Sequence, residues 1–268
     1  MLETRETRTA DGALLRWRRA GRRAAPAVLL LQGYGTPGGG WAAVLPALAG
    51  RFDCLVPDLR GTGRSGPVRG PLTGAQLAAD AVRLLDDAGV EQAHVVGNSL
   101  GGAVAQSLTA AAPERVSSLS LLATTCGHTA ARDLLFTRLE ELGDAGDKAG
   151  VVRALSPWAR RRGGSRLGDA VVAAAAPLGR AALRSTAEEL GALAHVIPSQ
   201  PPDLCDRLAA AVAEHAVPCL VLAGARDRLG ARHVELAAGH LLSGTPSAAR
   251  VLRRFLLDVE AGTVTRPS

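Results

Sequence analysis

Three residues of this chain could carry out nucleophilic catalysis, and Ser99 is the first of them. It lies at the centre of residues 97–101 (GNSLG), a G-x-S-x-G pattern that joins a short apolar run to a helix-favouring segment. Such a turn between strand and helix projects its central side chain from the edge of a sheet, and the flanking glycines admit the tight backbone. The pattern therefore indicates that Ser99 is a nucleophile.

A serine hydroxyl is a weak nucleophile at neutral pH and needs a base within hydrogen-bond reach. Of the six histidines, His240 is the preferred candidate, and His128 is its one serious rival because it also follows a predicted strand. Asp227 follows another predicted strand, and its carboxylate would fix the tautomer of the histidine. The predicted catalytic set is Ser99, Asp227 and His240.

The G-x-S-x-G motif is short, but four further stretches occur in order with it and together resemble the α/β-hydrolase family. They are residues 31–35 (LQGYG), 58–65 (DLRGTGRS), 222–227 (LAGARD) and 238–240 (AGH). The resemblance covers most of the chain and implies an oxyanion hole formed by the backbone N–H groups of Tyr34 and Leu100. It also implies a structural role for residues 58–65. One departure is Gln32, which occupies a position where the family usually has histidine.

The remaining segments indicate how these residues are positioned. Residues 27–31, 52–56 and 116–122 are short and apolar, as is typical of strands covered on both faces. Residues 77–88 have the periodicity of an amphipathic helix, and residues 4–19 read as an amino-terminal hairpin. The predicted fold class is α/β, with a mostly parallel central sheet flanked by helices.

The alternation of strands and helices stops between residues 127 and 200, where apolar residues recur at helical spacing. We predict a core formed by residues 1–126 and 201–268. Residues 127–200 are predicted to form a helical cap, inserted before the strand that carries Asp227. An insertion at the carboxyl edge of the strands would cover Ser99 as a lid, and in the family a cap at this place sets the choice of substrate. Residues 228–232 are too few for a crossover helix, so the last strand is predicted to be short or irregular.

Composition limits the classes of partner and compartment. The 268 residues are 47% hydrophobic, and the net charge of +6 comes from arginines scattered along the chain, which argues against nucleic-acid binding. Neither a secretory signal nor a membrane-spanning run is found, so we expect a cytoplasmic protein. The four cysteines lack C-x-x-C spacing and are expected to be free, buried thiols.

The expected activity is that of a serine hydrolase that cleaves a small or medium apolar carboxylic ester or lactone through an acyl-enzyme. No metal or other cofactor is implied, and an oligomer is left open. One alternative is a pseudo-hydrolase that keeps the fold to bind a ligand or partner. Another is hydrolysis of a carbon–carbon bond, or perhydrolysis, with the same three residues.

Overall fold

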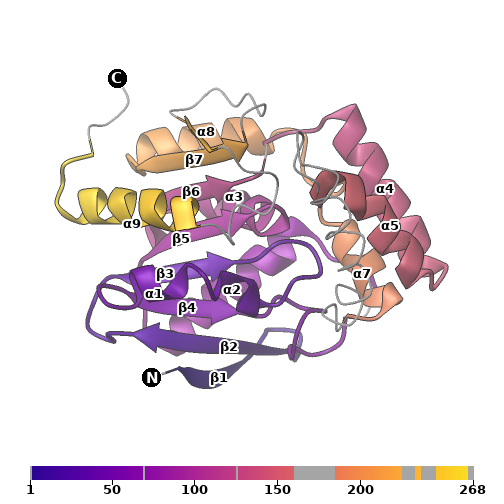
Figure 1. Cartoon of the computed structure of the whole chain (residues 1–268), viewed down its shortest axis with the longest axis horizontal. Helices are drawn as coiled ribbons and strands as arrows, with labels where there is room; N and C mark the ends of the chain where they lie inside the picture. Colours follow the sequence, from indigo (N-terminus) through magenta and orange to yellow (C-terminus); the bar gives the residue numbers. More distant parts are fainter. Residues whose placement is uncertain are drawn as a thin grey trace.

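The computed structural model describes residues 2–68, 70–124, 126–159, 185–224, 233–236 and 246–264. Within these ranges the strands form one eight-stranded sheet in the order β1-β2-β4-β3-β5-β6-β7-β8 (Figure 1). The strands are β1 (Glu3–Arg8), β2 (Leu14–Gly21), β3 (Ala27–Leu31), β4 (Asp53–Pro57), β5 (Ala93–Asn98), β6 (Val116–Leu122), β7 (Cys219–Gly224) and β8 (His233–Leu236). From β4 to β8 in this order, neighbouring strands are parallel. The predicted mostly parallel sheet is confirmed.

The predicted amino-terminal hairpin is also confirmed. Strands β1 and β2 pair antiparallel around a turn that contains Gly12, whose φ of +83° favours glycine. Strand β2 then pairs antiparallel with β4, with Trp17 opposite Pro57. The hairpin therefore closes one edge of the sheet, and its turn lies at the end where the parallel strands finish.

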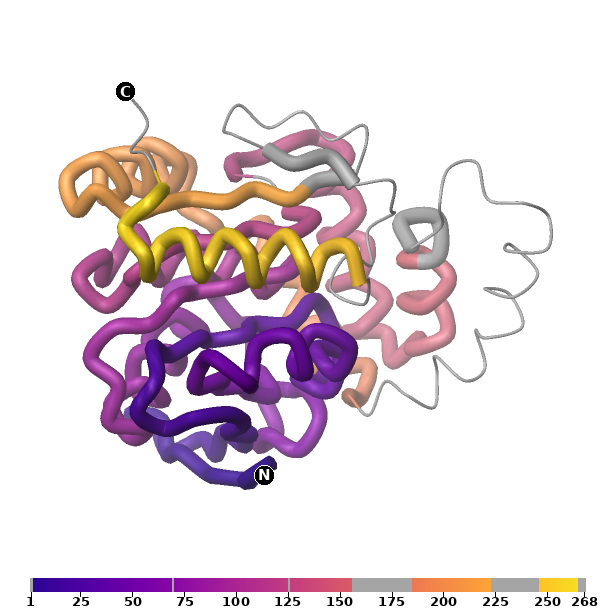
Figure 2. The backbone as a smooth tube through the Cα atoms, turned by 60° about the vertical axis from the view of Figure 1, so that its left-hand side comes forward, coloured from indigo at the N-terminus to yellow at the C-terminus, as the bar shows by residue number. Residues whose placement is uncertain are grey.

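Helices cover both faces of the sheet. They are α1 (Leu45–Leu48), α2 (Gly74–Ala88), α3 (Leu100–Ala111), α4 (Ala130–Asp144), α5 (Lys148–Ala159), α7 (Ala187–Ala194), α8 (Leu204–Glu214) and α9 (Pro246–Glu260), with short 3-10 turns at Gly38–Trp41 and Pro113–Arg115. Helices α2, α3 and α8 pack together, and α9 packs beside α1 on the other face (Figure 2).

Strand β3 shows why a strand inside this sheet can lack the alternation of apolar and polar residues. Val28 and Leu30 belong to the core cluster that contains residues of α9, whereas Leu29 and Leu31 belong to the cluster that contains residues of α2 and α3. All four side chains are fully buried. A parallel strand with helices on both faces needs apolar residues at every position, because neither face is open to water.

Helix α2 is defined by signals that can be read in the sequence. The Thr73 hydroxyl accepts from the Gln76 N–H, the Gln76 side chain accepts from the Thr73 N–H, and the helix ends at Gly89 in the left-handed conformation. The predicted amphipathic face is confirmed, since Leu77, Ala81, Leu84 and Leu85 are buried.

Helices α4, α5 and α7, called here the insertion helices, follow β6 and precede α8 and β7. They lie together at one end of the sheet, at the right of Figure 1. Helices α4 and α7 cross closely, because a Cβ atom at Gly143 would lie 2.4 Å from Gly191 Cα. The helical character predicted for this stretch is confirmed for the described residues. The boundaries of a cap domain stay a prediction.

The prediction of four free thiols is wrong for two cysteines. Cys126 and Cys205 form a disulfide with a Cα–Cα distance of 5.8 Å, while Cys54 and Cys219 are free. The pair joins the segment after β6 to the start of α8, across 79 residues of sequence. Local spacing rules did not reveal it, because only the tertiary fold brings these two segments together.

Strand β8 is four residues long and pairs parallel with β7, with His233 opposite Val221. The predicted short last strand is confirmed. The prediction that no crossover helix precedes it concerns residues 225–232, which lie outside the described residues. In the part of the chain that the structure describes, no helix is long and apolar enough to cross a bilayer.

Candidate active site

Ser99 occupies the turn between β5 and α3, as the sequence pattern predicts. Its φ of 53° and ψ of −116° lie in a region that L-residues with side chains rarely adopt. Three backbone hydrogen bonds hold it there. Its N–H donates to Leu122 O at 2.9 Å, and its carbonyl accepts from the N–H groups of Gly102 and Ala103 at 2.9 and 3.2 Å. The strained conformation is therefore imposed by β6 and by the first turn of α3.

Two glycines make this turn possible by permitting close backbone approach. A Cβ atom at Gly97 would lie 2.4 Å from Gly101 O, and one at Gly101 would lie 2.3 Å from Leu31 O. Strand β5, helix α3 and the end of β3 consequently pack more tightly around Ser99 than any side chain would allow. This is the strand–turn–helix context that a G-x-S-x-G motif requires.

The loop after β3 lies directly beside Ser99. Leu31 pairs with Gly97, and a Cβ atom at Gly33 would lie 3.3 Å from the Ser99 Cβ. Tyr34 follows Gly33, and Leu100 begins α3 immediately after Ser99. The first amides of a helix have no intrahelical acceptor and carry the positive end of its dipole. The two amides predicted to form an oxyanion hole thus belong to the segments that adjoin Ser99.

Gln32 has a role that the sequence analysis missed. Its Oε1 accepts from the N–H of Gly33 at 2.8 Å and from Asn98 Nδ2 at 3.0 Å, and both side chains are buried. The carboxamide therefore ties the loop after β3 to the residue that precedes Ser99. The sequence signal that could have pointed to this role is the pair of amide side chains, Gln32 and Asn98, each near the end of a predicted strand, while the structure shows that the two strands are neighbours.

Tyr34 is buried under the insertion helices. Its hydroxyl donates to the backbone carbonyl of Leu190 in α7 at 2.7 Å. Its ring packs edge-on against Phe136 of α4, with centroids 5.9 Å apart. Burial raises the pKa of Tyr34 well above its ordinary value, so its hydroxyl stays protonated and remains a donor.

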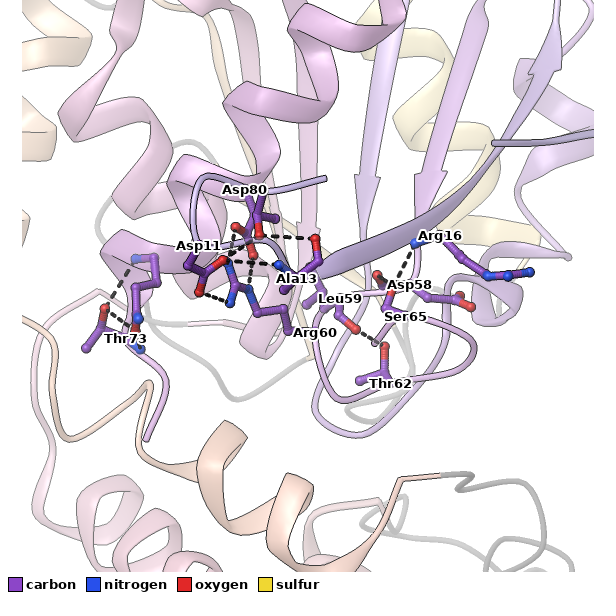
Figure 3. Close-up of polar contacts among 12 residues, drawn as sticks. Asp11, Ala13, Arg16, Asp58, Leu59, Arg60, Thr62, Ser65, Thr73 and Asp80 are labelled. Carbon is purple, nitrogen blue, oxygen red and sulfur yellow. Dashed lines mark hydrogen bonds and ion pairs between the residues drawn. The ribbon is translucent and has the colours of Figure 1, made fainter. Parts of the chain in front are cut away.

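Residues 58–65, which the resemblance implies are structural, form hydrogen bonds and ion pairs that hold neighbouring segments together. Asp58 accepts from the N–H of Gly38 at 2.8 Å and of Arg64 at 3.0 Å. Arg60 is buried and forms ion pairs with Asp80 of α2 and with Asp11 in the hairpin turn, each with a contact of 2.6 Å (Figure 3). The bond to Asp80, and to a smaller extent the bond to Asp11, raises the pKa of Arg60. The two ion pairs join the hairpin turn, helix α2 and residues 58–65.

The rival base His128 and three further histidines lie in the part of the chain that the structure describes in detail. The rival His128 contacts Asp133 through Nδ1 at 3.2 Å and Gln200 O through Nε2 at 3.0 Å, so both ring nitrogens hold parts of the insertion together. His94 contacts Ser118 and Glu260, and His195 contacts Glu140. His215 caps the carboxyl end of α8.

Asp227 and His240, the other two members of the predicted catalytic set, lie outside the described residues. The described strands β7 and β8 precede them along the chain. Asn98 pairs with Leu122 of β6, which pairs with Leu222 of β7, and Gly224 pairs with Leu236 of β8. Strands β7 and β8 therefore end at the same sheet edge as Ser99. Among the described residues, no His, Cys, Asp and Glu cluster could hold a metal ion.

Comparison of this sequence with those of known proteins identifies its family. A profile described as the alpha/beta hydrolase fold matches residues 26–163, just over half of the chain. A proposed carbamate hydrolase, RutD, from Azorhizobium caulinodans is 45% identical over 95 residues, which make up 35% of this chain and 36% of that protein. The match thus spans about a third of the length of that relative.

Solved structures share the whole fold. A hydrolase from Pseudomonas aeruginosa PA01 has a TM-score of 0.78 at 28% identity, with 96% of this chain and 98% of that one covered. The enol-lactonase from Burkholderia xenovorans LB400 also has a TM-score of 0.78, at 22% identity and with 96% and 100% covered, and shows the fold alone. The chain therefore belongs to the α/β-hydrolase fold family of enzymes.

Proposed function

We propose that this protein is a serine hydrolase that cleaves a small or medium apolar carboxylic ester or lactone through an acyl-enzyme on Ser99. The observation that carries the proposal is the backbone of Ser99, which is held at φ 53° between β5 and α3. Strain of this kind persists where the surrounding structure enforces it, and it concentrates at functional sites.

In the proposed reaction the Ser99 hydroxyl attacks the substrate carbonyl while His240 takes its proton and Asp227 stabilises the resulting imidazolium. The N–H groups of Tyr34 and Leu100 would donate to the oxyanion of the tetrahedral intermediate. Collapse of the intermediate breaks the ester bond, and the leaving alkoxide takes the proton from His240. Water, deprotonated by the same histidine, then hydrolyses the acyl-enzyme and frees Ser99.

The proposed preference for an apolar substrate rests on the surroundings of the loop beside Ser99. The ring of Phe136 packs against Tyr34, which follows Gly33 in that loop, and Leu190 accepts the Tyr34 hydroxyl bond through its backbone carbonyl. The side chains of Phe136 and Leu190 are both buried. We propose that residues 127–200 form a helical cap over the core formed by residues 1–126 and 201–268. An acyl group would then meet apolar side chains from α4 and α7.

Carbamate hydrolysis is a second candidate, because a relative named for it is 45% identical over the matched 95 residues. A carbamate presents a carbonyl to the same nucleophile and differs in the group attached to it. Both substrates are small molecules, and neither reaction requires a metal or cofactor.

The predicted cytoplasmic location stays a prediction. The Cys126–Cys205 disulfide argues against it, because disulfides persist mainly in oxidising compartments. Fractionation of cells that produce the full chain, followed by immunodetection, would decide between the compartments.

The proposal is tested with p-nitrophenyl esters of increasing acyl length and with a p-nitrophenyl carbamate. We expect turnover of short and medium esters by the parent and by Ser247→Ala, a control at an exposed serine of α9. Ser99→Ala should lose several orders of magnitude of kcat and remain folded. Activity of Ser99→Ala within tenfold of the parent would remove Ser99 from the mechanism. Faster turnover of the carbamate than of any ester would favour the second candidate.

A further inference from the structure

Tyr34 is a single residue that contacts three parts of the site. Its backbone lies in the loop beside Ser99, its hydroxyl is bonded to Leu190 O of α7, and its ring packs on Phe136 of α4. The two side-chain contacts reach different insertion helices, which themselves pack together. A displacement of either helix would therefore act on the loop that adjoins the nucleophile.

Gln32 holds the start of this loop through the N–H of Gly33, whereas the peptide of Tyr34 lies beyond that bond. Tyr34 stands between Gly33 and Gly35, and Gly35 has a φ of +60°. The N–H of Thr36 donates to Gly33 O at 3.1 Å to close a turn, and the Thr36 hydroxyl donates to Tyr34 O at 3.2 Å. Glycines on both sides give a peptide wide conformational freedom. The side chain of Tyr34 is consequently its main anchor within the described structure.

We propose that the Tyr34 side chain is a positioning group that couples the insertion helices to the oxyanion hole, by holding the Tyr34 amide in place through the hydroxyl bond to Leu190. This inference rests on the proposed function, since it assigns a task to a side chain whose own amide is the proposed donor. The hydroxyl does not touch the substrate. It acts on the reaction through the backbone N–H of the same residue.

The coupling makes a distinct prediction for Tyr34→Phe. This substitution keeps the ring on Phe136 and removes only the bond to Leu190 O. An oxyanion donor acts chiefly in the transition state, so kcat should fall about fivefold with KM nearly unchanged, equivalent to about 1 kcal/mol. The rate constant for labelling by a fluorophosphonate should fall by about the same factor. Hydrogen exchange in residues 32–36 should become faster.

Ser185→Ala is the matched control. The Ser185 hydroxyl also donates from the end of the insertion to a backbone carbonyl of the core, that of Gly61, and is likewise buried. Its hydrogen bond goes to residues 58–65 and not to the loop after β3. We expect Ser185→Ala to lower the thermal midpoint about as much as Tyr34→Phe, and to leave kcat and the exchange of residues 32–36 within twofold of the parent.

The outcomes separate this inference from the proposed function. If the parent reacts with the fluorophosphonate and Tyr34→Phe reacts within twofold of it, the coupling is refuted and the hydrolase proposal stands. Equal slowing in Ser185→Ala would also refute the coupling, because general loosening would then explain both. If the folded parent does not react at all, both proposals fail.

Discussion

Replacement of Gly101 by alanine tests the close packing that forces Ser99 into its conformation. A Cβ atom at this position would lie 2.3 Å from Leu31 O and 2.6 Å from Gln32 O, which are backbone atoms without rotational freedom. Contacts below 3.0 Å essentially never occur for real Cβ atoms, so α3 and the end of β3 would have to separate by about 0.7 Å. The variant should therefore displace Ser99 relative to the loop beside it.

Two opposing effects determine how Gly101→Ala changes the free energy of unfolding. Alanine is favoured over glycine within a helix by about 1 kcal/mol. Overpacking in a close-packed interior costs about 1–3 kcal/mol and rises when the neighbours are backbone. We expect a net loss of about 2 kcal/mol and, for a chain of this size, a thermal midpoint lower by about 5 °C. A displacement of Ser99 that approaches 1 Å should lower kcat by about 10- to 100-fold, because the rate depends steeply on the geometry of the reacting groups.

Urea unfolding followed by circular dichroism gives the stability change, and p-nitrophenyl ester turnover gives kcat. Gly50→Ala is the control, because a Cβ atom there meets nothing within 4 Å and Gly50 does not have a positive φ. Its free energy of unfolding should stay within about 0.5 kcal/mol of the parent. If Gly101→Ala is as stable and as active as the parent, the tight turn is not what positions Ser99.

Three further predictions concern contacts away from Ser99. Cys126→Ser should lower the free energy of unfolding by up to about 4.5 kcal/mol, the loop-closure value for 79 residues, and a reductant should lower the thermal midpoint of the parent but not of the variant. Arg60→Met should cost about 3 kcal/mol in urea unfolding because it leaves Asp80 buried without its partner, and Arg60→Met combined with Asp80→Leu should recover part of this loss. Hydrogen bonds from Arg60 lower the pKa of Asp11 in the folded protein. The Asp11 carboxylate therefore stabilises the fold at pH values above the pKa of the unfolded chain, which is about 4, and this stabilisation is lost as the pH falls toward the lower pKa of the folded state. Unfolding measured from pH 6 to pH 3 should therefore weaken less in Asp11→Asn; an equal decline in both proteins would contradict this role.

The features that could be predicted from sequence are those fixed by local chemistry. Strand β3 is apolar at every position because helices cover both faces of the sheet, as Leu29 and Leu30 show by joining opposite clusters. Helix α2 has a capping box at Thr73 and a left-handed glycine at its end. The turn at Ser99 needs glycines at fixed offsets. Each of these signals lies within a few residues of the structure that it specifies.

The features that could not be predicted depend on contacts between distant segments. Cys126 and Cys205 pair only because the end of β6 and the start of α8 meet in space. The bond of Gln32 to Asn98 requires β3 and β5 to be neighbours, which a residue pattern does not specify. The bond of Tyr34 to Leu190 crosses 156 residues of sequence. Side chains of this kind have no local periodicity or motif that would reveal their partners.

Covalent labelling by a fluorophosphonate tests most directly the proposal that Ser99 is an activated nucleophile. The folded parent and Ser247→Ala should each gain the mass of one adduct, which peptide mapping should place on Ser99, and folded Ser99→Ala should gain none. An adduct on another residue, or a folded parent that stays unlabelled under conditions in which a known serine esterase is fully labelled, would contradict the account.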